Sequence, residues 1–284
     1  MFFDLNIPIQ DAEDVHSLNH RERLGMAIRL GFDAVATNLV LEGKPAEKDK
    51  CKLVPTDLRS ILETVPSAAE ALQLNQRLLK GSGQKEILKQ MTRITIVLED
   101  STQAAQLNAA QAILATYDIV AVKPTSERTL QQACSMLDAD IITMDFTRRL
   151  PFRLRPQLVK QALQRGLLFE VEYSGLLRSG TARRQLIGQA AALMKACGVG
   201  GVVLTSGALR AMELRGPYDV VNLASLFELN TNAAKAALAS QCERVLAHGA
   251  ARKTFKGIIQ VVPLHMEEEA AGEGSGEEGM EVED

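Results

Sequence analysis

Residues 167–171 of this chain read Leu-Leu-Phe-Glu-Val, a short run that is apolar apart from Glu170. Runs that are apolar on both faces are typical of parallel strands whose sheet is covered on both sides. Six further runs of this kind lie along the chain, at Phe2–Ile7, Ala34–Leu39, Ile94–Leu98, Ile119–Val122, Ile141–Met144 and Val199–Leu204. The sequence therefore predicts an α/β protein with about seven parallel strands, which must be joined by crossover helices.

Helical patterns lie between these runs, where crossover helices are expected. They cover Leu18–Leu30, Thr102–Ala115, Glu127–Leu137 and Arg183–Cys197. Seven such units match the rhythm of a TIM-like (β/α) barrel, which typically takes ~250 residues, and we expect the barrel domain to span residues 1–262. An open doubly wound sheet is the alternative, but no glycine fingerprint of a dinucleotide-binding half follows an early strand. The segment Gly81-Ser82-Gly83 lacks the Lys-Ser/Thr of a phosphate loop and indicates a flexible surface turn.

The composition is that of a core-forming globular protein. Of the 284 residues, 46% are hydrophobic and 24% are charged, while 4% are aromatic and none is Trp, which disfavours single-strand binding by stacked aromatics. No run approaches the ~20 apolar residues of a membrane span, and the N-terminus lacks the pattern of a secretory signal. Four widely spaced cysteines show no zinc or redox pairing. We therefore expect an intracellular protein with reduced thiols and no membrane partner.

The net charge of −3 conceals two segments of opposite sign. Residues 263–284 carry nine acidic residues and no Lys or Arg, so we expect a disordered acidic tail that serves solubility or masks a basic surface. The segment 148–184 carries nine basic residues against two acidic ones, and eight of the nine are Arg. Arg engages phosphate through a planar fork, so this bias favours phosphate recognition.

Two positions of basic residues indicate anion binding more specifically than the number of basic residues does. Arg183 and Arg184 are predicted in the first turn of a helix, where cations oppose the helix dipole unless an anion binds there. The second placement, Ser206–Asp219, follows the seventh strand, where phosphate sites commonly form in barrels. Pro217 predicts a helix start in this segment. For this segment, anion binding and a plain helix-start loop remain equally supported.

The search for catalytic groups finds no protein-carried active site. His16 and His20 are four residues apart and could face one metal, but no third ligand is apparent, so an exposed helix face is the favoured interpretation. Glu170 and Glu172 share one face of a strand, which favours a buried Glu with an Arg partner over acid–base catalysis. We therefore expect no catalytic residue, no metal site and no cofactor.

Several segments together resemble a known family. They are Arg93–Val97, Tyr117–Val122, Leu150–Phe152, Arg165–Glu170, Glu213–Asp219 and His248–Thr254. The chain resembles the thirty-kilodalton protein subunit of eukaryotic and archaeal ribonuclease P, shared in eukaryotes with ribonuclease MRP, from about Phe2 to Ile259. The resemblance implies a barrel akin to the polymerase and histidinol phosphatase metal hydrolases. Those enzymes place a His-x-His metal pair at the end of the first strand, where this chain reads Asp4-Leu5-Asn6, so the metal site looks lost.

By the resemblance, catalysis belongs to the RNA, and the protein is an RNA-binding structural subunit acting in 5′-leader removal from precursor tRNA and in rRNA processing. Its expected partners are the ribonuclease P or MRP RNA, a small partner protein and other protein subunits, with precursor tRNA contacted indirectly, in the nucleus and nucleolus. A metal-dependent phosphoesterase on the same barrel is the alternative. The candidate RNA-binding residues are Arg148, Arg149, Arg153, Arg155, Arg178, Arg183, Arg184, Arg210, Arg215, Arg252 and Lys253.

Overall fold

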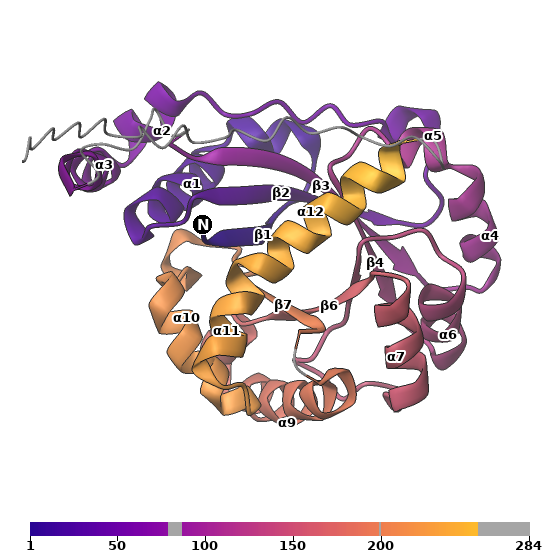
Figure 1. Cartoon of the computed structure of the whole chain (residues 1–284). Coiled ribbons are helices and arrows are strands. Elements are labelled where there is room, and N and C mark those ends of the chain that lie inside the picture. Colours follow the sequence, from indigo (N-terminus) through magenta and orange to yellow (C-terminus); the bar gives the residue numbers. More distant parts are fainter. Residues whose placement is uncertain (79–86, 199, 255–284) are drawn as a thin grey trace, which may run out of the picture.

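A computed structural model describes residues 1–78, 87–198 and 200–254. Seven parallel strands in this part of the chain pair in chain order and form a nearly closed barrel (Figure 1). The strands are β1 Phe3–Ile9, β2 Ala34–Glu42, β3 Lys89–Leu98, β4 Ile119–Pro124, β5 Ile141–Thr143, β6 Leu168–Glu172 and β7 Val202–Thr205. Each contains or overlaps one predicted run, so the barrel prediction is confirmed.

The barrel closes between β1 and β7 through side chains and the loop that follows β7. The backbone N–H of Gly207 donates to the carbonyl of Asn6 at 3.1 Å. The N–H of Ser206 donates to Asp4 Oδ1 at 3.0 Å, and its hydroxyl donates to the Asn6 carbonyl at 3.2 Å. Polar groups within β1 and in the loop after β7 therefore complete the ring in place of a regular ladder.

Helices surround the strands. They are α1 Leu18–Leu30, α2 Leu58–Thr64, α3 Pro66–Leu78, α4 Thr102–Ala109, α5 Gln111–Leu114, α6 Glu127–Ser135, α7 Pro156–Gln164, α8 Gly175–Arg178, α9 Gly180–Cys197, α10 Pro217–Leu223, α11 Thr231–Leu238 and α12 Ser240–Lys253.

The predicted helix 18–30 has the bounds of α1, because the Ser17 hydroxyl caps its first turn and Gly31 ends it in the left-handed region at φ 89°. The predicted helix 102–115 is instead divided into α4 and α5 at Ala110. The predicted helix start at Pro217 is confirmed. The segment 81–83 and the predicted acidic tail lie outside the described residues.

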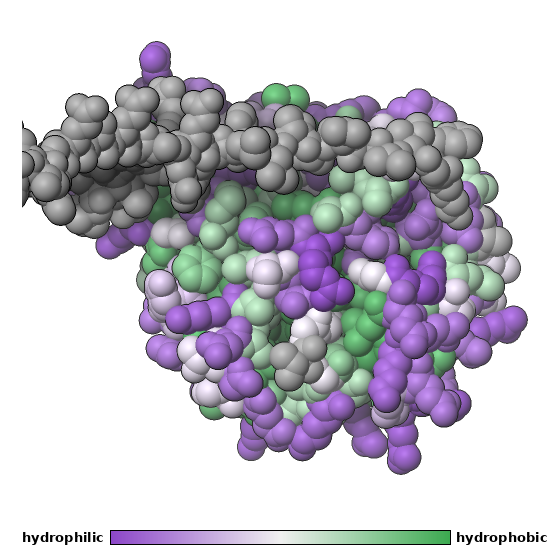
Figure 2. Space-filling view, viewed as in Figure 1, coloured by the Kyte–Doolittle hydropathy of each residue, from purple (hydrophilic) through white to green (hydrophobic). Residues whose placement is uncertain are grey.

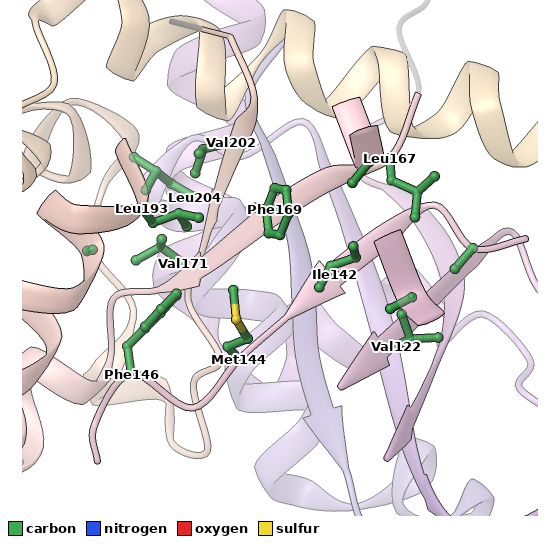
Figure 3. Packing of buried hydrophobic residues seen from close by; sticks show 14 of the residues in the cluster. Val122, Ile142, Met144, Phe146, Leu167, Phe169, Val171, Leu193, Val202 and Leu204 are labelled. Atoms are coloured by element: carbon green, nitrogen blue, oxygen red, sulfur yellow. The ribbon is translucent and has the colours of Figure 1, made fainter. Parts of the chain in front are cut away.

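Two apolar layers hold the barrel together. Between the strands and the outer helices, Phe169 and Val171 of β6 belong to one cluster with Leu193 of α9 (Figure 3). Inside the barrel, a second cluster includes Phe3, Leu5, Ala34, Met91, Ile119, Ile141, Leu168 and Val203. Cys242 and Val245 of α12 join this interior cluster, so α12 closes the end of the barrel at which the strands begin (Figure 1). The four cysteines are free thiols, as predicted.

The docking of α12 uses the basic block His248–Thr254. A Cβ on Gly249 would lie 2.4 Å from the carbonyl oxygen of Asp118, so only glycine allows this close approach. Asp140, fully buried just before β5, accepts from His248 Nδ1 at 2.7 Å and pairs with Arg252 at 3.1 Å. Lys253 Nζ lies 2.7 Å from Asp118 Oδ1. The block therefore anchors a helix across the barrel.

Candidate nucleic-acid interface

The interior of the barrel, above its apolar cluster, is filled by a buried ion pair. Arg93 of β3 and Glu170 of β6 meet through two hydrogen bonds of 2.6 Å, and both side chains are fully buried. Arg93 also donates to the Leu5 carbonyl at 2.8 Å and to Thr95 Oγ1 at 3.2 Å. Thr205 Oγ1 donates to Glu170 at 2.8 Å. The predicted pairing of a buried Glu with an Arg is confirmed, and its partner is Arg93.

Side-chain amides continue this network towards the open mouth. Asn6 Nδ2 donates to Glu172 Oε1 at 3.0 Å, and Asn38 Nδ2 donates to Asn6 Oδ1 at 2.8 Å. Thr95 Oγ1 donates to Asn38 Oδ1 at 2.8 Å. Burial and the charge of Glu170 raise the pKa of Glu172. The interior is therefore a connected polar network, in which the carboxylates are held by donors of the protein itself.

The donor set inside the barrel does not fit a catalytic metal. A guanidinium group, which repels a cation, lies within hydrogen-bond distance of Glu170, and the side chain that β1 contributes beside it is the amide of Asn6. Among the described residues, no group of three or more His, Cys, Asp or Glu side chains is arranged to hold a metal ion.

The two histidines of the predicted pair differ in their exposure to solvent. His16 is exposed, whereas His20 is fully buried with its Nε2 3.4 Å from Thr37 Oγ1. Burial and the charge of Arg23 lower the pKa of His20 to about 4, so it is neutral at pH 7. The predicted exposed helix face is therefore wrong for His20, because α1 turns this side chain against β2.

Asp4 has an unusual environment at the seam of the barrel. It is 1% exposed, its Oδ1 accepts from the N–H groups of Ser206 and Asn6, and its Oδ2 has no hydrogen-bond partner. Burial raises its pKa to about 6, against the hydrogen bonds from Ser206, which act to lower it. Asp4 is therefore a structural group whose protonation couples to stability.

Four of the candidate arginines line one groove. The groove has a volume of about 1470 Å³ and lies between α9 and the loop that precedes α7. Arg149, Arg153 and Arg155 come from the loop side, and Arg184 comes from α9. All four side chains are exposed. Figure 2 shows hydrophilic side chains gathered over the outer surfaces of α7 and α9.

The loop that carries these arginines is held in place by α9. Gln189 accepts from the N–H of Leu150 at 2.9 Å and donates to the carbonyls of Phe146 and Arg148 at 3.1 and 2.6 Å. Phe152 is 8% exposed and anchors the loop in the core. The basic side chains of the loop therefore project from a fixed backbone.

One of the four arginines is paired. Arg155 Nη2 lies 2.5 Å from Glu127 Oε1, but the two side chains are 66% and 48% exposed. Exposed pairs of this kind contribute about 0–1 kcal/mol, so Arg155 can exchange its partner at little cost. Within the described part of the chain, the groove therefore presents Arg149, Arg153 and Arg184 without an ion pair, and Arg155 with a weak one.

Three further candidates, Arg148, Arg178 and Arg210, follow strands β5, β6 and β7 at the mouth of the barrel. Arg148 is exposed, with Asp145 4.0 Å from its Nε. Arg178 Nη2 contacts the Gly207 carbonyl at 2.9 Å and Glu213 at 3.3 Å. Arg210 is exposed.

Two of the arginines weighed for anion binding are engaged by the backbone. Arg183 Nε donates to the Leu176 carbonyl at 2.8 Å, which ties α9 to α8. Because α9 begins at Gly180, Arg183 and Arg184 lie just beyond its first three residues. Arg215 Nη1 donates to the carbonyls of Met212 and Leu214 at 2.8 and 2.7 Å, so it braces its own loop.

The structure corrects the assignment of Arg252. Its side chain is 1% exposed and is enclosed by Asp140 and the carbonyl of Leu114. A buried guanidinium with these acceptors has no access to an RNA phosphate. Lys253, beside it, is paired with Asp118. Both lie at the α12 end, opposite the groove, because α12 packs where the strands begin.

Arg93 is the residue that the sequence predictions missed. Among the described residues it heads the fully buried side chains in volume, yet the sequence predictions gave it no role. The signal in the sequence was a single Arg at the start of an apolar strand run. A charge buried without a partner is too costly to persist, so such an Arg indicates a buried carboxylate nearby.

Comparisons with known proteins agree with this architecture. The family model described as RNase P subunit p30 matches residues 1–254. Ribonuclease P protein subunit p30 of Mus musculus is 36% identical over 247 residues, which cover 87% of this chain and 87% of that protein. Protein GAMETOPHYTE DEFECTIVE 1 of Arabidopsis thaliana is 34% identical over 261 residues, which cover 89% of this chain and 45% of that protein, so the chain spans less than half of that relative.

A solved structure shares the fold. A chain of an archaeal ribonuclease P determined with mature tRNA matches with a TM-score of 0.56 at 16% identity, covering 93% of this chain and 100% of that one. The family match extends over all seven strands and every described helix, including α12 with its basic block. The chain therefore belongs to the ribonuclease P subunit p30 family.

Proposed function

We propose that this chain is an RNA-binding structural subunit of the ribonuclease P and ribonuclease MRP particles, acting in 5′-leader removal from precursor tRNA and in rRNA processing. Membership of the p30 family supports the role in ribonuclease P. A Saccharomyces cerevisiae relative, 30% identical over 173 residues, is named as a ribonuclease P/MRP subunit, which supports the extension to MRP. The filled barrel interior supports a role in binding rather than in catalysis.

The observation that carries the RNA-binding proposal is the groove with four arginines on its walls. Guanidinium groups there would neutralise the phosphates of an RNA strand and release its counterions. Contacts to phosphates position RNA without reading its sequence. Arg148, Arg178 and Arg210 at the barrel mouth extend the proposed basic surface, and Arg183, Arg215 and Lys253 have their donors partly engaged and are secondary candidates.

The expected partners are the ribonuclease P or MRP RNA and other protein subunits of these particles, including a small one, with precursor tRNA held indirectly. Along residues 1–78, 87–198 and 200–254, no helix is long and apolar enough to cross a bilayer. We further propose a nuclear location that includes the nucleolus. Sequencing the RNA that copurifies with the tagged protein tests these assignments, because it distinguishes ribonuclease P RNA from MRP RNA.

The decisive test compares two triple variants that remove the same charge. Arg149→Ala, Arg153→Ala and Arg184→Ala together should weaken RNA binding and reduce the slope of log K against log salt by about 2 to 3, since each phosphate contact contributes about 0.7–0.9. The matched control removes three exposed cations from α1, α2 and the segment between β2 and α2, namely Arg29, Arg59 and Lys44. It should leave the slope unchanged. Equal slopes for wild type and the groove triple would contradict the proposal.

The metal-dependent phosphoesterase has no comparable support, because the carboxylates of the interior are held by Arg93 and amide donors. Elemental analysis of the purified protein tests it directly. Stoichiometric zinc or manganese, together with a phosphatase activity that chelation abolishes, would overturn the scaffold proposal.

A further inference from the structure

A second cavity lies at the mouth of the barrel, where the strands end. Its volume is about 260 Å³. The chain segments that line it come from the ends of β4 and β6, from the loop that follows β5, and from α8 and α9. No residue that lines the arginine groove also lines this cavity. The cavity is therefore a separate feature, which RNA binding in the groove does not explain.

Three cationic side chains line the cavity from different elements. Lys123 lies in β4, Arg148 in the loop after β5, and Arg178 in the last turn of α8. Two carboxylates, Asp145 and Glu172, also line it. The formal balance of the lining is +1 when both carboxylates are ionised.

The acceptor atoms of Asp145 are largely used within its own loop. Its Oδ1 accepts from both the N–H and the hydroxyl of Thr147, at 3.1 and 2.5 Å. Its Oδ2 lies 4.0 Å from Arg148 Nε, beyond hydrogen-bond distance. Asp145 therefore shapes the loop, and its 4.0 Å contact to Arg148 is the shortest that this guanidinium makes to a carboxylate of the described residues.

Glu172 is an incomplete counter-charge. Its Oε1 accepts from Asn6, and burial together with the neighbouring charge of Glu170 raises its pKa. A carboxyl group with a raised pKa is more readily protonated, and the protonated form donates a hydrogen bond. Asn6 already occupies one oxygen of Glu172, so this carboxylate only partly balances the cations of the lining.

Donors in the cavity outnumber the acceptors that satisfy them. Lys123 is half-buried, and within the described part of the chain its ammonium group makes neither a hydrogen bond nor an ion pair; its interaction with Glu172 is electrostatic. Arg178 uses Nη2 for its contacts to Ser174, Gly207 and Glu213, and among residues 1–78, 87–198 and 200–254 its Nε and Nη1 have no acceptor. Arg178 shares its charge with Glu213, which lies outside the lining, and Arg148 is 89% exposed, so this is an open site at the barrel mouth. Its cationic donors favour an anion with several acceptor oxygens.

We propose that the barrel mouth binds a single phosphoryl group through Lys123, Arg148 and Arg178. Lys binds phosphate as a point charge and Arg as a fork, so the three donors suit a tetrahedral oxyanion. The volume lies below the range of about 300–1000 Å³ that holds drug-sized ligands, which favours a phosphate group over a whole nucleotide. The group is supplied by free phosphate or by the phosphorylated end of an RNA.

Calorimetric titration with inorganic phosphate at constant ionic strength tests the site. Wild type should bind saturably below about 10 mM, which suffices to detect a dissociation constant of about 1 mM. Lys123→Met should weaken binding at least about tenfold, the value of one charge-assisted hydrogen bond. Arg148→Ala, at a side chain that is 89% exposed, should weaken it several-fold without any effect on folding. The matched control Lys160→Met removes an exposed cation of α7 and should bind like wild type.

Three results would overturn the proposal: no saturable binding by wild type, wild-type affinity in both Lys123→Met and Arg148→Ala, or an equal loss in Lys160→Met. Circular dichroism of each variant checks that it is folded. If Lys123→Met does not fold, Arg148→Ala alone still tests the proposal.

A second titration, with short RNAs that carry a 5′-phosphate or a 5′-hydroxyl, identifies the source. If wild type binds the 5′-phosphorylated RNA more tightly and Lys123→Met abolishes this difference, the site binds an RNA end. If wild type binds the two RNAs equally but still binds inorganic phosphate, the site binds free phosphate. The groove variants test a different set of residues, so either proposal can fail alone.

Discussion

Replacing Arg93 with methionine should destabilise the barrel by about 3–5 kcal/mol, the cost of leaving a buried charge without its partner. The pair is fully buried, and the substitution removes two hydrogen bonds of 2.6 Å to Glu170. It also leaves the Leu5 carbonyl without this donor. Asn6, at 3.3 Å, and Thr205, at 2.8 Å, remain as donors to the Glu170 carboxylate, together with the side chain of Thr143.

Urea unfolding followed by circular dichroism measures the loss directly. At about 2 °C per kcal/mol for a domain of this size, the melting temperature should fall by about 6–10 °C. Arg93→Met combined with Glu170→Gln should cost less than the sum of the two single variants, because the second substitution removes the unpaired charge. The expected coupling is about 1–3 kcal/mol.

The pH dependence should change in a defined direction. Burial acts to raise the pKa of Glu170, but the charge of Arg93 and the hydrogen bonds outweigh it, so the pKa is lowered. In wild type this stabilisation is present above the ordinary value of 4.5 and is lost as the pH falls through the lower folded value. In Arg93→Met the pKa of Glu170 should rise, because its cationic partner is gone. The stability difference between wild type and Arg93→Met should therefore shrink as the pH is lowered towards 5. A single-variant cost below about 1 kcal/mol, or additive costs, would refute the reasoning.

Three further predictions concern the seam, the closing helix and the tail. Asp4 has a folded pKa of about 6 against an ordinary value of 3.8, so wild type should lose about 3 kcal/mol of stability as the pH rises through this window. Asp4→Asn should lack that loss in urea unfolding; parallel pH profiles would contradict it. Gly249→Ala places a Cβ 2.4 Å from a backbone carbonyl and should cost about 1–3 kcal/mol, measured as a lower melting temperature, whereas Gly188→Ala, with open space around its Cβ, is the control. An equal effect of both substitutions would refute the docking argument. Deleting residues 267–284 removes nine carboxylates and should tighten non-specific RNA binding at low salt, and unchanged affinity would leave solubility as the role of this segment.

The apolar runs predicted the barrel because a parallel strand covered on both faces needs a locally continuous apolar sequence. This requirement is satisfied within each run, so strands such as β4 and β6 were identified without knowledge of their neighbours. The end signals of α1, Ser17 and Gly31, are likewise local, and its predicted bounds are confirmed. Longer-range pairing was predicted only in kind: Glu170 was expected to have an Arg partner, but Arg93, 77 residues away in the chain, was not identified.

In the candidate interface, too, local features were predicted and contacts between distant segments were not. Clustering of Arg between residues 148 and 184 is visible in the chain, and the chemical preference of Arg for phosphate follows from the side chain itself. Which arginines share a surface depends on how α9 packs beside the loop before α7. Arg184 joins Arg149 and Arg153 by this packing, whereas Arg252 is buried against Asp140.

By itself, then, the sequence determined the strand and helix alternation, the barrel class and the excess of arginine, because these depend on residue type and local spacing. Only the tertiary structure decided the partner of Glu170, the burial of Arg252 and the gathering of four arginines around one groove. These depend on contacts between segments far apart in the chain, where a charged side chain is either enclosed by acceptors or left facing solvent.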